Sequence, residues 1–236
     1  MTDVLNRNSY PEKDILSSVS IDCIIFGLDE GRLKVLLVER AIEPSFGLWA
    51  LPGGFVLEQE DLDVAARRTL EATTGMTNVF MEQVQAFGKV GRFPWRRVVT
   101  IAYYALIKSI HGNLRAGPDA SDVRWFDVKQ VPELVFDHRQ ILHAALSTLR
   151  TKVRREPIGF ELLPQKFTLS ELQGLYEAVL DTTFDTRNFR KKLLKMNLLV
   201  ELDERQTGVP HRAARLYSFN RESYESLKEK GFIFEL

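Results

Sequence analysis

The chain of 236 residues is long enough for one or two domains, each able to bury a hydrophobic core. Its 32 basic and 32 acidic residues balance, so any contact with nucleic acid requires a local basic patch. The single cysteine, Cys23, excludes a disulfide framework and is expected to be buried. No apolar run reaches the length of a membrane span, and the N-terminal residues form no hydrophobic signal segment, so we expect a cytoplasmic protein with no membrane partner.

The first half of the chain is predicted to form strands around one helix. Residues 1–16 are polar and are expected to be a flexible arm. Residues 19–40 are predicted to form a β-hairpin, because two aliphatic runs flank the turn at 29–31. A helix is expected over 62–74, ended by Gly75. Further strands are predicted at 80–89, 97–108 and 123–126, before a helix over 137–153.

The second half of the chain has a different plan. The segment after Arg155 carries two prolines and a glycine, so we predict a boundary between domains 1–155 and 156–236. Helices are then predicted from Thr168 to Leu180 and from Asp185 to Met196. Strands at 198–204 and 214–220 and a helix at 221–230 follow. Two helices followed by a β-hairpin are typical of a winged helix-turn-helix.

The stretch Gly53–Met76 resembles a Nudix box that has lost its three catalytic glutamates. The Nudix signature reads G-x5-E-x7-R-E-U-x-E-E-x-G-U, where U is aliphatic. This chain keeps Gly54, Glu60, Arg68, Leu70, Gly75 and Met76 in that spacing. Leu48, Trp49, Leu51 and Pro52 precede the box as in the usual W-x-L-P-G-G sequence. An ordinary amphipathic helix after a glycine turn is the simpler interpretation, but it does not require this spacing.

The three missing glutamates decide the expected chemistry. Nudix hydrolases use them to hold magnesium on one helix face, whereas this chain has Thr69, Ala72 and Thr73 at those positions. The remaining acid, Glu71, lies about 200° round the helix from position 69 at ~100° per residue. We therefore predict no metal, no cofactor and no catalytic residues, and a Nudix pocket that binds rather than reacts.

The helix predicted at 185–196 carries a basic face. Phe189, Leu193 and Met196 share one side, whereas Arg187 and Lys191 lie on the other. A solvated charged face is the commonest explanation of such a helix, but the preceding helix and the following hairpin favour a DNA-recognition helix. The predicted DNA-binding residues are Thr186, Arg187, Asn188, Arg190, Lys191, Lys192, His211 and Arg212.

With both halves considered, the chain resembles the NrtR family of Nudix-related transcriptional regulators. The matching segments are the degenerate box, VVTIAYYALI, FDHRQIL, FTLSELQGLYEAVL, TRNFRKKLL, HRAARLY and YESLKEKGFIFEL. The resemblance implies an α+β protein, a Nudix α/β/α sandwich with a mixed sheet followed by a winged helix-turn-helix. It also implies a repressor that binds double-stranded DNA at a palindromic operator as a homodimer, and that responds to a small-molecule effector.

The resemblance leaves the effector open between a pentose, a sugar phosphate and ADP-ribose. The closing KEKGFIFEL is similar to the sugar-responsive, AraR-like branch that controls carbohydrate metabolism, and GRFPWRR departs from the RDPRG-like pattern of ADP-ribose sensors. By Nudix geometry the expected effector-binding residues are Asp22, Arg40, Arg92, Trp95, Arg97 and His138. Competing structural explanations are that Asp22 pairs with an adjacent strand, that Arg40 is a surface charge and that Trp95 only packs.

The alternative hypothesis is a Nudix pyrophosphohydrolase that acts on ADP-ribose or another nucleoside diphosphate derivative. Its metal would be held by displaced acids such as Glu58, Glu60 and Glu71. Its C-terminal domain would then serve oligomerisation. The substitutions in the box argue against this hypothesis.

Overall fold

The structure is a computed structural model that describes residues 15–43, 45–77, 79–108, 110, 112, 114–208 and 212–235. The chain divides into two compact units. One contains the described residues up to Gly27 together with Lys34–Thr148, and the other contains Leu28–Leu33 and the chain from Leu149 onward. The division falls inside helix α2 (His138–Arg155), and the domain boundary at residue 155 stays a prediction.

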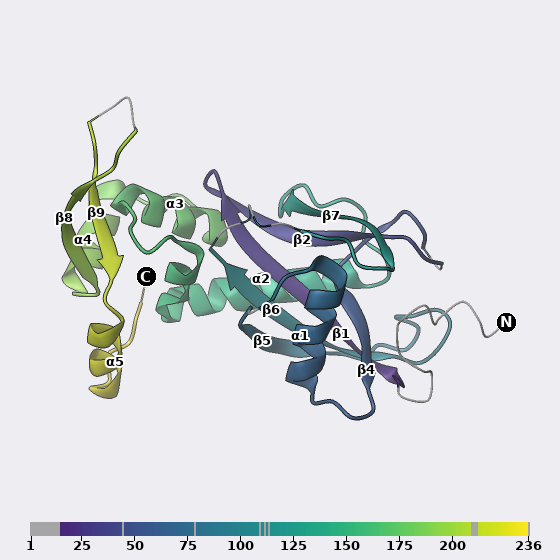
Figure 1. The fold of residues 1–236 in the computed structure, drawn as a ribbon. Coiled ribbons are helices and arrows are strands. Elements are labelled where there is room, and N and C mark those ends of the chain that lie inside the picture. The colour runs from purple at the N-terminus through teal and green to yellow at the C-terminus, as the bar shows by residue number, and fades with distance from the viewer. Residues whose placement is uncertain are drawn as a thin grey trace. The chain divides into compact units, whose positions relative to one another are not determined.

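The first unit is built on a seven-stranded mixed sheet (Figure 1). The strand order is β3-β2-β1-β6-β5, with β4 also paired to β1 and β7 to β2. Strand β1 runs parallel to β6 and antiparallel to β4. The strands are β1 (Ile15–Asp29), β2 (Arg32–Arg40), β3 (Trp49–Ala50), β4 (Gly53–Leu57), β5 (Met81–Phe87), β6 (Val99–Ile107) and β7 (Ala120–Asp127).

Alternation along β1 assigns its side chains to the two faces of this sheet. Ile21, Cys23 and Ile25 belong to one buried cluster with Leu70 of α1 (Leu62–Thr74). The side chain of Asp22 lies on the opposite face, beside the start of α2. Figure 1 shows α1 and α2 on opposite sides of the sheet, which confirms the predicted sandwich.

Three strands of the sheet, β1, β3 and β4, differ from the prediction. Residues 15 and 16 were assigned to the flexible arm, but they begin β1 and pair with Leu57 and Val56 of β4. The short strands β3 and β4 were not predicted. Both lie within the glycine- and proline-containing segment before the box helix, where the side chains alternate too briefly to indicate a strand.

The second unit is a winged helix domain, as predicted (Figure 1). A 3-10 helix (Pro157–Leu162) precedes α3 (Leu169–Leu180), which begins with a capping box between Thr168 and Glu171. Its remaining elements are α4 (Thr186–Lys195), β8 (Leu199–Arg205), β9 (Arg215–Phe219) and α5 (Arg221–Glu229). The Tyr176 and Phe189 rings, 5.9 Å apart, join α3 to α4 in the core.

The wing is the hairpin of β8 and β9. It is extended by a backbone bridge between Phe167 and Tyr217, whose amides each donate to the other residue's carbonyl at 3.0 and 2.8 Å. An ion pair between Arg215 and Glu201 links the two strands. Residues 209–211 of the connecting loop lie outside the described residues, and the predicted DNA contact His211 is among them.

Candidate functional sites

The loop before the box helix is held by the two fixed charged residues of the Nudix signature. Arg68 Nε donates to Glu60 Oε2 at 2.8 Å, and Arg68 Nη2 donates to the Phe55 carbonyl at 2.8 Å. Glu60 also accepts from the Leu57 amide at 2.6 Å. Burial would raise the pKa of Glu60, but these hydrogen bonds and the charge of Arg68 lower it below its usual value. Arg68 and Glu60 therefore have a structural role here.

The three altered positions of the box line a cavity beside the sheet. Thr69, Ala72 and Thr73 are among its lining residues, whereas Glu71 is not. The Thr73 hydroxyl donates to the Thr69 carbonyl at 2.7 Å, within the helix. The Thr69 side chain is buried, and its hydroxyl has no hydrogen-bond partner among the described residues. The orientation predicted for positions 69, 71, 72 and 73 is thus confirmed.

The residues present do not fit the magnesium site of a Nudix hydrolase. Two hydroxyls and a methyl group replace the carboxylate oxygens that a hard divalent cation requires. Of the displaced acids considered above, Glu60 is engaged with Arg68, and Glu71 lies outside the cavity. Within the described ranges, no three His, Cys, Asp or Glu side chains are grouped as they would be around a metal ion.

Glycines allow the box to approach the strand that carries Asp22. A Cβ atom at Gly53 would lie 2.5 Å from Asp22 Oδ1, and one at Gly54 would lie 3.3 Å from the Thr69 hydroxyl. Gly117 is confined in the same way, because its Cβ would lie 2.0 Å from the Ala72 carbonyl. These close contacts shape the cavity wall, and they explain two glycines of the box in physical terms.

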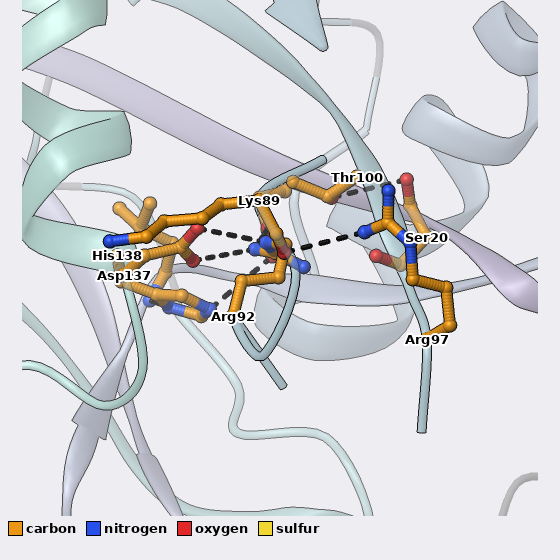
Figure 2. A network of polar contacts seen from close by, with 9 residues as sticks. Ser20, Lys89, Arg92, Arg97, Thr100, Asp137 and His138 are labelled. Atoms are coloured by element: carbon orange, nitrogen blue, oxygen red, sulfur yellow. Dashed lines mark hydrogen bonds and ion pairs between the residues drawn. The ribbon is translucent and has the colours of Figure 1, made fainter. Parts of the chain in front are cut away.

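A buried ion-pair network forms one side of the cavity (Figure 2). Arg92 donates to both carboxylate oxygens of Asp137, from Nε at 2.8 Å and from Nη2 at 2.7 Å, and Figure 2 shows its side chain pointing toward that residue. The same Nη2 lies 3.5 Å from Asp22 Oδ2. Asp22 therefore pairs across the fold rather than with an adjacent strand residue, and one guanidinium bridges two buried carboxylates.

His138 completes this network in its neutral form. Its Nδ1 accepts from the Leu51 amide at 3.0 Å, so the proton of the neutral ring lies on Nε2, which is 3.7 Å from Asp22 Oδ1. Burial is the largest effect and lowers the pKa of His138. The negative charges of Asp22 and Asp137 raise this pKa, and the positive charges of Arg92 and Arg40 lower it further.

We expect the stability of the Nudix domain to fall as the pH drops from 7.5 to 5.5. Because the folded pKa of His138 lies below its unfolded value, the unfolded state binds more protons in this window and is favoured there. Glu60 contributes to the pH dependence of stability only at more acidic pH, because its folded pKa lies below the usual carboxyl value and therefore below this window. Urea titrations at both pH values should show that His138→Gln reduces the loss. His143→Gln, at an exposed position of the same helix, should retain it, and equal losses in both variants would contradict this assignment.

Four of the six expected effector residues line one cavity of about 250 Å³: Asp22, Arg40, Arg92 and His138. Arg40 is half-buried rather than a surface charge. Burial lowers its pKa, whereas the negative charges of Asp119, Asp22 and Glu43 raise it. Trp95 and Arg97 are not lining residues. Trp95 packs edge-on against Phe93 and Phe136, which do line the cavity, and exposed Arg97 donates to the Lys89 carbonyl at 3.3 Å (Figure 2).

Phe93, Phe136 and Asp137 belong to this site but were not predicted from the sequence. Asp137 stands beside His138 in the FDHRQIL segment, so its charge next to a histidine was an available signal. Phe136 adopts a φ of 52°, which is uncommon for an aromatic residue. This backbone places its ring 5.7 Å from the His138 ring, with Arg40 5.8 Å from its centre.

The second candidate site is the exposed face of α4. Phe189 and Leu193 are buried, whereas Arg187, Asn188, Lys191 and Lys192 are exposed. The Asp185 side chain caps the helix by accepting from the Asn188 amide at 2.9 Å. The predicted register of this helix is therefore confirmed.

The remaining predicted DNA contacts differ in their surroundings. Arg190 is half-buried, and its Nη2 donates to the Ser170 hydroxyl of α3 at 3.0 Å. Thr186 accepts from the Gln173 side chain at 3.3 Å. Arg212 is exposed at the wing.

Among the helices of the described chain, none combines the length and hydrophobicity needed to cross a bilayer.

Comparisons with known proteins match both halves of the chain. Residues 17–145 match the NUDIX domain family, and residues 159–219 match the NrtR DNA-binding winged helix domain family. The ADPR responsive transcriptional repressor NtrR of Acinetobacter baylyi is 34% identical over 223 residues, which cover 92% of this chain and 88% of that protein.

Two further proteins match different extents of the chain. The crystal structure of Shewanella oneidensis NrtR complexed with a 27mer DNA is 30% identical with a TM-score of 0.71, over 88% of this chain and 95% of that one. An ADP-ribose pyrophosphatase of Methanocaldococcus jannaschii is 34% identical over 125 residues, which cover 53% of this chain and 70% of the enzyme.

Proposed function

Since the chain belongs to the NrtR family of Nudix-related transcriptional regulators, we propose that it is a DNA-binding repressor whose Nudix domain binds an effector without hydrolysing it. The observation that carries the proposal is the combination of two features in one chain. The Nudix box has Thr69, Ala72 and Thr73 where a hydrolase needs carboxylates, and helix α4 of the winged helix exposes basic side chains.

The DNA-binding part of the proposal rests on the surface of α4. Arg187 and Lys191 extend from the face of the helix opposite the buried Phe189 and Leu193, with Lys192 at the flank, as a helix lying in the major groove requires. The relative from Shewanella oneidensis was crystallised with a 27mer DNA, which supports the same use of this domain. We propose that a homodimer presents two such helices to a palindromic operator.

The effector part of the proposal assigns the ligand to the cavity beside the box. Asp22, Arg40, Arg92 and His138 are its proposed polar contacts, and Trp95 and Arg97 are the weaker candidates because they do not line it. The Acinetobacter relative is named for a response to ADPR, which favours ADP-ribose. The resemblance of the C-terminal segment to the sugar-responsive branch favours a pentose or a sugar phosphate.

The similarity to the Methanocaldococcus pyrophosphatase favours the hydrolase alternative, but the chemistry of the box disfavours it. Hydrolysis by that route needs a metal ion to activate water and to bind the diphosphate. The box of this chain offers no carboxylate at the three ligand positions.

We expect the full-length chain to shift duplex DNA in a mobility assay and to release no AMP from ADP-ribose with magnesium. A Nudix pyrophosphatase run in parallel provides the positive control for hydrolysis. Turnover near 1 per second or faster, as in ordinary enzymes, would make the hydrolase alternative correct. An effector must also bind one state of the repressor more tightly than the other, so it should change the DNA affinity several-fold.

A further inference from the structure

The turn between α3 and α4 is held by two polar side chains of α3. This turn, residues 181–185, is exposed except for the half-buried Phe184. The Phe184 amide donates to Glu177 Oε1 at 2.8 Å, and the Phe184 carbonyl accepts from Gln173 Nε2 at 3.1 Å. Gln173 Nε2 also donates to Glu177 Oε1 at 2.9 Å, since residues four apart share one helix face. Both backbone polar groups of Phe184 are therefore bound by the same face of α3.

The same two residues also reach the ends of the turn. Gln173 Nε2 donates to the hydroxyl oxygen of Thr186, the first residue of α4, at 3.3 Å. The Glu177 carbonyl accepts from the amides of Asp181 and Thr182, where the turn begins. Gln173 is only 8% exposed. A buried amide with several partners rigidifies its surroundings, because its hydrogen bonds are lost when the groups move apart.

Apolar packing alone does not fix the rotation of α4 about its axis. Phe189 and Leu193 anchor this helix in the core. Burial of apolar surface is non-directional, whereas a hydrogen bond depends on both distance and angle. Arg187 directly follows Thr186, so any rotation at the start of α4 displaces the guanidinium that is expected to read a base. The hydrogen bonds from α3 are therefore the contacts that set the direction in which this side chain points.

We propose that Gln173 and Glu177 are positioning residues for sequence-specific DNA binding. By holding Phe184 and Thr186, they fix the start of α4 at the angle at which Arg187 meets base edges. Specific contacts tolerate displacements of only about 0.5 Å, whereas attraction to phosphates extends over a Debye length of about 8–10 Å. Loosening the turn should therefore reduce the preference for the operator more than the affinity for random DNA. This inference rests on the proposed repressor function and deepens its DNA-binding part.

The test compares full-length variants on two duplexes, one selected from a random pool by the wild-type chain and a scrambled one of the same composition. Gln173→Met retains an unbranched side chain in the core but removes the amide. It should reduce the ratio of the two affinities about tenfold, because the base contacts of α4 are misplaced. Its affinity for the scrambled duplex should stay within about twofold of the wild-type value. A general loss of folded protein would instead lower both affinities in parallel.

Two substitutions of Glu177 provide the matched pair. Both hydrogen bonds to Oε1 come from amide N–H groups, so Glu177→Gln retains an acceptor at the same place. It should keep the ratio of affinities within about twofold of the wild-type ratio, even if the loss of a negative charge raises the affinity for all DNA. Glu177→Met leaves the Phe184 amide without its acceptor and should reduce the ratio about tenfold. Thermal unfolding should verify that each variant folds, and if Gln173→Met does not, the Glu177 pair decides the question.

The outcomes separate the inference from the function on which it rests. Wild-type ratios in both Gln173→Met and Glu177→Met would overturn the positioning role, and so would a parallel loss on both duplexes. Equal losses in Glu177→Gln and Glu177→Met would assign the effect to charge rather than to hydrogen bonding and would also overturn it. A wild-type chain that selects no duplex from the pool would contradict the proposed repressor function itself.

Discussion

Arg92→Ala is expected to lower the free energy of unfolding of the Nudix domain by about 3–5 kcal/mol. The Arg92 side chain is 5% exposed and forms a two-pronged pair with Asp137 and a longer contact with Asp22. Its removal would leave two buried carboxylates without their cation, in a site from which water is largely excluded. The cost arises from these uncompensated charges, and it exceeds the net stabilisation that the intact pairs provide.

Urea unfolding followed by tryptophan fluorescence measures this effect in the relevant domain. All three tryptophans of the chain, Trp49, Trp95 and Trp125, lie in the Nudix domain, so the signal does not report unfolding of the winged helix. The control is Arg97→Ala, five residues away and exposed, which should change stability by no more than about 0.5 kcal/mol. A loss below about 1 kcal/mol in Arg92→Ala would mean that the carboxylates of Asp22 and Asp137 are accessible to water.

Local signals account for the parts of the fold that were predicted closely. The box helix spans Leu62–Thr74 as expected, because Gly75 ends it with a φ of 74° that favours glycine. Helix α3 ends at Leu180 as predicted, and its capping box at Thr168 involves residues only three positions apart. Such signals depend on neighbours in the sequence, so they can be recognised without knowledge of the tertiary structure.

Contacts between distant segments account for what was not predicted. The partners Asp22 and Arg92 are 70 positions apart, and Arg92 and Asp137 are 45 apart, so no spacing rule indicates their network. Trp95 and Arg97 were expected to line the effector site together with Arg92 by Nudix geometry. The turn between β5 and β6 instead places the Arg92 side chain inside and leaves Trp95 and Arg97 exposed. Four of the six residues expected around the effector line a common cavity, and their role in binding stays a prediction.

Arg187→Ala is expected to weaken binding to the operator by about 1–3 kcal/mol and to relax the preference for one base pair. Arg187 lies in the first turn of α4, is exposed and projects from the face opposite the buried Phe189 and Leu193. The N-terminal residues of a recognition helix meet base edges in the major groove, and a guanidinium there can donate to both O6 and N7 of guanine. A change at this position should therefore affect one base rather than all DNA equally.

Lys192→Ala distinguishes this readout from simple charge attraction. Lys192 is also exposed, but it lies at the flank of the buried face, where its ammonium can reach a phosphate and no base edge. Its removal should weaken specific and random DNA alike and reduce the slope of log affinity against log salt by about one. The measurement uses a duplex selected from a random pool by the wild-type chain, a scrambled duplex and a salt series. If Arg187→Ala binds the selected duplex as tightly as the wild type does, then Arg187 does not read a base in the operator.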